Sequence, residues 1–340
     1  MKKEKWILAV ITMVLVFGSM TGLCVFMERI QGETVVESVK KEQGSDKEEA
    51  DEQEGIAQKP FQVLVSGMDT FGSKKTGRND LNLLLTVNPN SKTILITHIP
   101  RDLYVKAEGL SEAEFKGMTK RAIRLTKESF QANPSTRLCW LGYFGPKTLV
   151  KTVEGLLDTK VDYFVQMNFP GFSSLIDAVG GVDVNVEADF QTDWGNSYKK
   201  GKNHLNGKEA LAFVRERHHL NEQEFRDRNQ VKMMRAIISK LAGESALEMD
   251  ADALYKLWKD NVKTDMGAGE ILSLIRMQVS DRAKWNIKSA MLKGDGDLKE
   301  LGGFYESSTE NPRFYVLVAK DASLEKVKKK IGDVGQSPND

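Results

Sequence analysis

The stretch from Phe61 to Val105 constrains the fold of this chain more than any other part. It contains three short apolar runs, at residues 61–66, 81–87 and 93–99, and each is bounded by turn residues. Runs of this length are too short for helices, so we expect three adjacent strands. The tetrapeptide Asn88-Pro89-Asn90-Ser91 between the last two runs is typical of a turn and predicts a hairpin.

Charged residues lie at the ends of these three runs. They are Asp69 after the first run, Arg78 and Asp80 before the second, and Arg101 and Asp102 after the third. If the last two runs form a hairpin, these positions share one edge of the sheet. We therefore expect the carboxylates of Asp69 and Asp80 and the two guanidinium groups to meet there.

A long apolar segment lies near the N-terminus. Residues 6–27 contain no charged side chain, and lysines occur in residues 1–5. Roughly 20 uncharged residues match the thickness of a bilayer, and the lysines predict a cytoplasmic N-terminus. We predict a single-pass membrane protein whose bulk lies outside the cell. A cleaved signal peptide is one alternative, although no small-x-small site follows, and a lipoprotein modified at Cys24 is another.

Composition suggests how the remainder is divided. Residues 28–59 are rich in acids and poor in apolar residues, so they predict a flexible tether. We assign 60–245 to a catalytic domain, with a helical insertion at 106–135 that is either a lid or a solvated helix without a role. Residues 246–332 should pack on the same domain, and 333–340 should form a disordered tail. The net charge of +1 says little about partners.

Apolar strands and helices alternate beyond the insertion. A helix beginning at Pro146, a strand at 161–168, a helix from Pro170 and a strand at 182–186 are expected in turn. This alternation predicts an α/β fold with a mixed central sheet. The only two cysteines, Cys24 and Cys139, do not predict an intramolecular disulfide because one lies in the proposed membrane span.

Two arginine pairs occur at the end of one predicted helix and the start of the next. They are Arg215 with Arg217, and Arg226 with Arg228. The planar guanidinium fork matches phosphate, so several arginines indicate a multiply charged anion such as diphosphate. Two aspartates at strand ends suit Mg2+, which takes one or two carboxylates, waters and phosphate oxygens. Together these groups indicate phosphoryl transfer, whereas each alone is compatible with a turn residue, a solvated helix end or a surface ion pair.

Several motifs follow one another in an order found in a known family. They are V-S-G-M-D-T, G-R-N-D-L-N-L-L-L-T-V-N-P, I-P-R-D-L-Y-V, I-D-A-V-G-G-V-D-V, E-A-L-A-F-V-R-E-R and R-D-R-N-Q. From about Phe61 to Leu241 the chain resembles the LytR-CpsA-Psr family of Gram-positive cell-wall enzymes. The resemblance implies an α/β/α sandwich outside the membrane, behind one transmembrane helix. It also implies transfer of a teichoic acid or capsular polysaccharide from a polyprenyl diphosphate carrier to peptidoglycan.

The resemblance assigns roles to individual residues. The implied catalytic residues are Asp69, Asp80, Arg101 and Arg217, and the two aspartates would hold Mg2+. The implied diphosphate ligands are Arg78, Arg101, Arg137, Arg215, Arg217, Arg226 and Arg228. The implied lipid-binding residues are Phe164, Met167, Phe169, Phe172, Leu175 and Ile176, for which ordinary core packing is the alternative.

Some residues depart from the family pattern, and other functions remain open. Asn79 stands where a small hydroxyl residue is common, and Trp140 stands where histidine is common. A non-catalytic binder of lipid-linked glycan that regulates wall synthesis and a polyprenyl-diphosphate hydrolase are the rival functions. Nucleic acid is not an expected partner, because the arginine pairs would lie across a membrane from the chromosome. The expected partners are the lipid-linked glycopolymer, peptidoglycan and the lipid bilayer.

Overall fold

The computed structural model describes residues 59–70, 77–110, 135–217, 223–242, 261–267, 270, 273–274, 277, 284–301 and 313–336. The predicted membrane span, most of the acidic tether and residues 111–134 of the predicted insertion lie outside these ranges. Within them, no helix combines the length and apolar character needed to cross a membrane.

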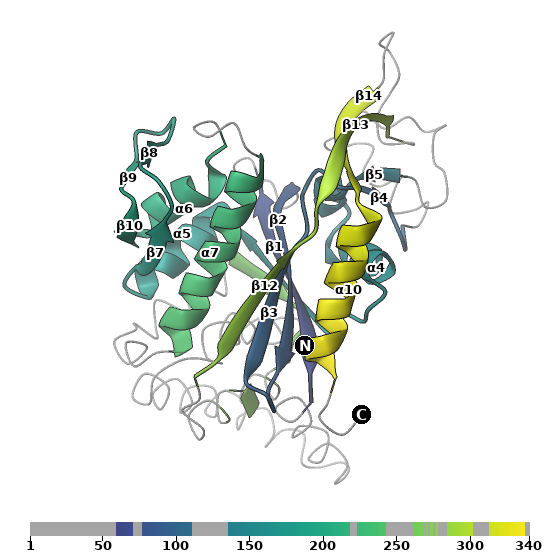
Figure 1. Ribbon diagram of the computed structural model, residues 1–340, viewed down its shortest axis with the longest axis horizontal. Coiled ribbons are helices and arrows are strands. Elements are labelled where there is room, and N and C mark those ends of the chain that lie inside the picture. The colour runs from purple at the N-terminus through teal and green to yellow at the C-terminus, as the bar shows by residue number, and fades with distance from the viewer. Residues whose placement is uncertain are drawn as a thin grey trace, which may run out of the picture.

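A six-stranded mixed sheet forms the centre of the described fold (Figure 1). Its order is β11 (Val262–Thr264), β6 (Tyr163–Asn168), β1 (Phe61–Asp69), β2 (Arg78–Asn88), β3 (Thr93–His98) and β12 (Asn286–Met291). The predicted hairpin is confirmed, since β2 pairs antiparallel with both β1 and β3. Strand β6 runs parallel to β1, and β12 runs parallel to β3, so both sheet halves contain a parallel pair.

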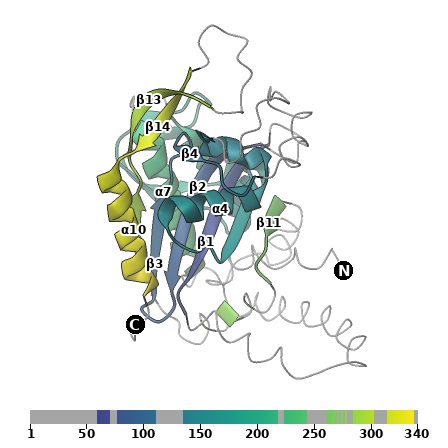
Figure 2. The same ribbon diagram turned by 90° about the vertical axis from the view of Figure 1, so that its right-hand side faces the viewer.

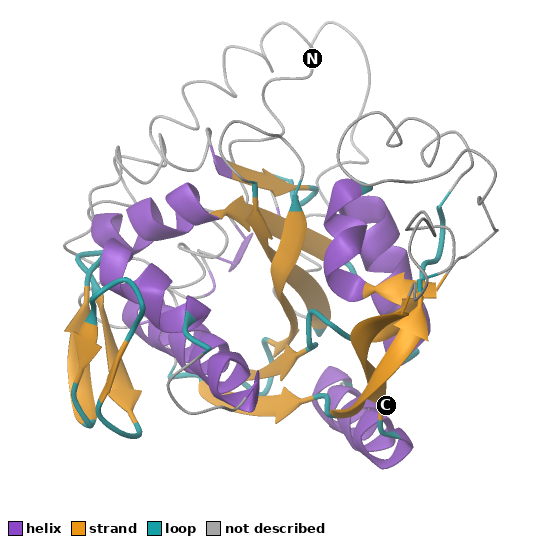
Figure 3. Cartoon of the chain, turned by 90° about the horizontal axis from the view of Figure 1, so that it is seen from above, coloured by secondary structure: helices purple, strands orange, loops and turns teal. Residues whose placement is uncertain are grey.

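Helices cover both faces of this sheet because its strands are apolar on both sides. In β1, Val63 and Val65 belong to one core and Leu64 to the other. The first core is closed by α5 (Phe169–Ala178), α6 (Gly207–Arg215) and α7 (Gln223–Ala242), and the second by α4 (Pro146–Leu157), α10 (Asp321–Gly335) and the 3-10 helix η2 (Leu138–Tyr143). The view from above shows these helices on either side of the strands (Figure 3). The predicted mixed sheet between two helical layers is thus confirmed.

Four two-stranded ribbons surround the central sheet. They are β4 (Tyr104–Lys106) with β5 (Ser135–Arg137), β7 (Val182–Val186) with β10 (Gly201–Leu205), β8 (Phe190–Gln191) with β9 (Ser197–Tyr198), and β13 (Gly294–Glu300) with β14 (Arg313–Ala319). Lys106 pairs with Ser135, so both ends of the predicted helical insertion are strand residues. The prediction of a helix is therefore wrong for Lys106 and Ser135. The short β4–β5 ribbon joins these two ends of the insertion.

The C-terminal helix extends into the predicted disordered tail. Helix α10 continues to Gly335, so residues 333–335 are helical where a disordered tail was predicted. Val334 is buried in the second core, and Asn88 Nδ2 donates hydrogen bonds to the backbone oxygens of Val334 (2.8 Å) and Gln336 (3.1 Å). The β2–β3 turn therefore holds the end of the helix, which lies along the outside of the sheet (Figure 2).

Candidate active site

A β-bulge at the start of β2 sets the geometry of the site. Gly67 pairs with Leu81 and Met68 pairs with Asn79, so Asp80 is an extra residue without a partner in β1. Without the bulge, Asp80 would lie opposite Met68, on the face of the sheet away from α7. The bulge also places Arg78 opposite Asp69, on one face. Both residues and Asp80 therefore reach the same cavity.

The cavity, of about 360 Å³, lies between the sheet and helices α5, α6 and α7. Its charged wall is formed by Asp69, Arg78, Asp80, Arg101, Asp193, Arg215, Arg217 and Arg226. Its apolar wall includes Val65, Leu81, Val165, Met167, Phe172, Leu211, Met233, Met234 and Ile237. One cavity thus combines a polar wall rich in arginine with an apolar wall, as expected for a site that binds an amphiphilic anion.

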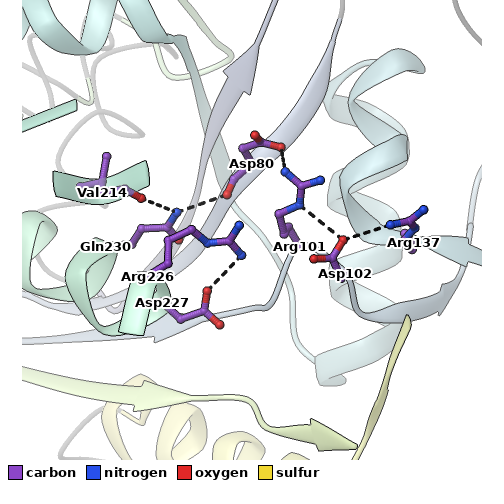
Figure 4. A network of polar contacts seen from close by, with 8 residues as sticks. All are labelled: Asp80, Arg101, Asp102, Arg137, Val214, Arg226, Asp227 and Gln230. Atoms are coloured by element: carbon purple, nitrogen blue, oxygen red, sulfur yellow. Dashed lines mark hydrogen bonds and ion pairs between the residues drawn. The ribbon is translucent and has the colours of Figure 1, made fainter. Parts of the chain in front are cut away.

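The side chain of Arg101 links two carboxylates at the polar end (Figure 4). Its Nη1 bonds to Asp80 Oδ1, and its Nε lies 3.4 Å from Asp102 Oδ1. Arg101 is only 6% exposed, so burial excludes water from these ion pairs. The result is an oriented Asp80 carboxylate at the cavity wall.

The other arginines at the cavity differ in their pairing within the described part of the chain. Arg215 and Arg217 make no side-chain ion pair there, and Arg226 pairs with Asp227 through Nη2 (3.2 Å) while its buried Nε has no hydrogen-bond partner. Burial, with the charges of Arg226 and Arg101, lowers the pKa of Arg217 to about 10. Excess positive charge at a cavity wall favours binding of a polyanion.

A buried polar network supports these residues from behind (Figure 4). Gln230 Nε2 donates to the backbone oxygens of Asp80 (3.3 Å) and Val214 (3.4 Å). His98 Nε2 donates to Gln230 Oε1 (3.0 Å) and lies 3.7 Å from Asp227 Oδ1. Burial lowers the pKa of His98 despite the opposing effect of Asp227, so the imidazole is neutral at pH 7. The network joins the bulge to α7.

An aromatic stack holds Arg215 at the cavity. Its guanidinium lies 4.9 Å from the centroid of the Phe169 ring and 4.8 Å from that of the Trp194 ring. Trp194 is 51% exposed and lies between β8 and β9, and all three residues line the cavity. Both rings therefore help to hold the Arg215 guanidinium at the cavity wall.

The structure separates some predicted site residues from the cavity. Arg228 points away from the cavity and pairs with Glu187 (3.5 Å) and Glu224 (3.9 Å). Arg226 lies two positions earlier on α7, and side chains two positions apart on a helix point in different directions. Arg137 pairs with Asp102 (3.5 Å) and stacks near Trp140 and Phe314, so it touches the site only through Asp102.

Two of the six predicted lipid-binding residues also lie elsewhere. Phe164 packs against the second core, because it alternates with Val165 and Met167 along β6. Ile176 is fully buried in the first core and does not line the cavity. Met167, Phe169, Phe172 and Leu175 line it. Sequence reasoning missed Trp194, Gln230 and Met233, which only their position in three dimensions identifies.

Asp69 and Asp80 are the residues that could hold a metal ion. Both line the cavity, next to the arginines that suit phosphate. The described residues contain no group of three or more His, Cys, Asp or Glu side chains able to hold a metal ion. Two carboxylates nevertheless fit Mg2+, whose remaining ligands are typically waters and substrate phosphate oxygens.

Comparison with known proteins identifies the family. A model of the LytR_cpsA_psr family matches residues 26–331. This chain belongs to the LytR-CpsA-Psr family. A family relative, the polyisoprenyl-teichoic acid--peptidoglycan teichoic acid transferase TagU of Bacillus subtilis (strain 168), is 31% identical over 331 residues, which are 96% of this chain and 98% of TagU.

Solved structures of similar proteins share this LytR-CpsA-Psr fold. The crystal structure of B. subtilis TagV has a TM-score of 0.61 and 26% identity, covering 83% of this chain and 99% of TagV. A structure of TagT bound to LIIa-WTA has a TM-score of 0.57 and 25% identity, covering 82% of this chain and 92% of TagT. The fold found here is therefore the fold of these family members.

Proposed function

We propose that this protein transfers a glycopolymer of the teichoic acid or capsular polysaccharide type from a polyprenyl diphosphate to peptidoglycan. The observation that carries the proposal is the first cavity, in which five arginines lie beside an apolar interior. A lipid-linked diphosphate has the matching charge and apolar tail. The names of the TagU relatives, which describe transfer of teichoic acid to peptidoglycan, support the same reaction class.

Each group at the cavity has a role in this proposal. Arg215, Arg217 and Arg226 bind the diphosphate oxygens, and the ion pair of Arg101 with Asp80 fixes the position of both side chains. A hydroxyl oxygen of the acceptor attacks the glycan-side phosphorus, and the hydroxyl proton is lost. The bond from that phosphorus to the bridging oxygen breaks, and polyprenyl phosphate leaves with the electron pair. The arginines stabilise the charge that develops on the bridging oxygen.

Mg2+ is the cofactor we propose for this site, held by Asp69 and Asp80. When bound, the ion would neutralise charge on the phosphate oxygens. Met167, Phe172 and Leu175 would contact the first part of the lipid and exclude water from the diphosphate. A hydrolase would need water at the same phosphorus, so this exclusion favours transfer over hydrolysis.

We also propose that the protein is anchored by residues 6–27, with its N-terminus in the cytoplasm and its folded part outside the cell membrane. The apolar segment and its flanking lysines support this arrangement, and peptidoglycan as acceptor requires it. Protease added to intact cells should remove the folded part and spare the N-terminus. Protection of the folded part would contradict the topology.

The proposed reaction can be tested with full-length protein in detergent micelles. A short glycan on a polyprenyl diphosphate, labelled in the glycan, should transfer label to added peptidoglycan when Mg2+ is present. Arg101→Ala and Arg217→Ala should each lower turnover at least 100-fold, roughly the loss of one transition-state interaction. Wild-type turnover in both variants would reject the assignment. Label in free phosphoglycan would indicate a hydrolase, and tight binding without release of polyprenyl phosphate would indicate a regulatory binder.

A further inference from the structure

A second cavity, of about 390 Å³, lies behind the arginine cluster. It is bordered by the start of α7, the residue before Arg101, the end of β12 and the β13–β14 ribbon. We call it the ribbon groove and define it by Pro100, Glu224, Asp227, Lys293, Gly296 and Tyr315. None of these residues belongs to the wall of the first cavity.

Glycines on one face of the ribbon create the hollow. Gly294 and Gly296 of β13 lie on the same face as Tyr315 and Leu317 of β14, because Gly296 pairs with Leu317. A Cβ atom at Gly296 would lie 2.9 Å from Tyr315 Cε2, and one at Gly294 would lie 2.6 Å from the Val318 backbone oxygen. The groove therefore has a backbone floor, with the 46% exposed ring of Tyr315 lying against Gly296.

The charges around the groove are already balanced. Glu224 pairs with Lys293 (3.0 Å), Asp295 pairs with Lys320 (2.7 Å), and Asp227 pairs with Arg226 (3.2 Å). A free cation or a polyanion would have to break one of these pairs. Paired carboxylates keep lone pairs that accept hydrogen bonds from hydroxyl or amide groups. The groove thus suits a ligand rich in such groups with an apolar face for the tyrosine ring, which describes a saccharide.

The ribbon groove and the first cavity share a wall. Asp227 lines the groove, and its partner Arg226 lines the cavity; likewise Pro100 lines the groove, and the next residue, Arg101, lines the cavity. In the close view, Asp227 lies on the far side of Arg226 from Asp80 (Figure 4). A saccharide in the groove would therefore end next to the guanidinium groups assigned to the diphosphate.

We propose that the ribbon groove binds the sugar chain of the acceptor, with Tyr315 as its aromatic platform. This inference rests on the proposed transferase function, because it assigns the second substrate of that reaction. It also explains why the β13–β14 ribbon stands over the same end of the sheet as the bulge (Figure 1). Donor and acceptor would then bind on opposite sides of the Arg226–Asp227 pair.

Three variants of full-length protein test the groove. Tyr315→Ala removes the ring, and Gly296→Val fills the floor and displaces the same ring. Leu298→Ala is the matched control, since Leu298 pairs with Tyr315 in the ribbon and is 53% exposed but does not line the groove. The ligand probe is a soluble, peptide-free glycan fragment of peptidoglycan, and the donor is the labelled lipid-linked glycan.

Tyr315→Ala and Gly296→Val should each raise the KM for the fragment roughly tenfold, the size of one lost aromatic contact. The Kd of the donor should stay within about twofold, and Leu298→Ala should match the wild type. Unchanged KM in both groove variants, or an equal rise in the control, would overturn the proposal. Saturation-transfer NMR of the fragment on wild type and Tyr315→Ala needs no turnover. A signal with the wild type that is lost in Tyr315→Ala would support binding in the groove even if the protein transfers no glycan. Absence of a signal with the wild type would overturn the proposal.

Discussion

Arg217 destabilises the folded protein when no anion is bound. Folding lowers its pKa from the ordinary arginine value to about 10, so its positive charge destabilises the folded state at every pH below about 10. This cost decreases as the pH rises above about 10 towards the pKa of the unfolded chain. Arg217 is exposed to solvent, and screening by the solvent limits this destabilisation.

We expect Arg217→Gln to stabilise the protein while it removes activity. Without a bound anion, loss of the repelled charge should raise the Tm at pH 7 by roughly 2–4 °C, and turnover should fall at least 100-fold. Thermal unfolding and the label-transfer assay measure the two effects. Near pH 11 the gain in Tm should shrink, because wild-type Arg217 is then partly neutral. A lower Tm for the variant at pH 7 would show that Arg217 has a stabilising role.

The Phe169–Arg215–Trp194 stack makes a separate prediction at the residue scale. Trp194→Ala should weaken donor binding roughly two- to fivefold, because one cation–π contact at a partly exposed site contributes about 0.5–1 kcal/mol. Trp194→Phe keeps a ring and should recover most of the affinity. Titration of the lipid-linked diphosphate gives both values. Equal affinity in the wild type and Trp194→Ala would mean that Arg215 is held without the ring.

Single residues also show where sequence reasoning stops. The arginine-rich motifs pointed to Arg215, Arg217 and Arg226 as an anion site, and the structure places all three at the cavity wall. They could not separate Arg226 from Arg228, whose directions depend on the rotation of α7 about its axis. Trp194 gave no signal in the sequence, since one tryptophan in a polar loop has no periodicity.

At the scale of elements, the three N-terminal strands were predictable and the bulge was not. Alternation and turn residues located β1, β2 and β3 to within a few residues. The register shift at Gly67 and Met68 depends on what packs against β2, and residue type alone does not reveal it. Strand β13, with the sequence Gly-Asp-Gly-Asp-Leu-Lys-Glu, was missed because a polar exposed ribbon lacks a strand pattern.

The 3-10 helix η2 should be essential to the bulge. A Cβ at Gly142 would overlap the backbone oxygen of Gly77 and lie 2.7 Å from Asn79 Oδ1. Gly142→Ala should therefore push the start of β2 away, lower the free energy of unfolding by roughly 1–3 kcal/mol, and weaken donor binding through Arg78 and Asp80.

A matched glycine in α10 provides the control for this experiment. Among the described residues, no atom beyond its own stretch of helix lies within 4 Å of a Cβ placed at Gly332, so Gly332→Ala should raise the free energy of unfolding by roughly 0.5–1 kcal/mol and leave donor binding unchanged. Urea unfolding and donor titration measure both variants. Normal donor affinity in Gly142→Ala would show that η2 does not set the position of the bulge.

At the scale of the whole molecule, the sheet separates stability from chemistry. The face that packs against α5, α6 and α7 contains the first cavity, whereas the opposite face is filled by α4 and α10. The two cavities both open near the end of the sheet where β1 ends and β2 begins. Changes to the second core should therefore alter stability more than donor binding.

Truncation of the C-terminal helix tests this separation. Deleting residues 332–340 removes buried Val334 and the hydrogen bond that its backbone oxygen accepts from Asn88. This hydrogen bond joins residues that are 246 positions apart in the sequence. Loss of one buried aliphatic side chain and one buried hydrogen bond should lower the free energy of unfolding by roughly 2–4 kcal/mol. Deleting only 337–340 keeps both contacts and should leave stability unchanged. At 10 °C, where the shorter chain remains folded, its donor Kd should equal that of the wild type; a rise of tenfold or more would show that the second core also positions the arginines.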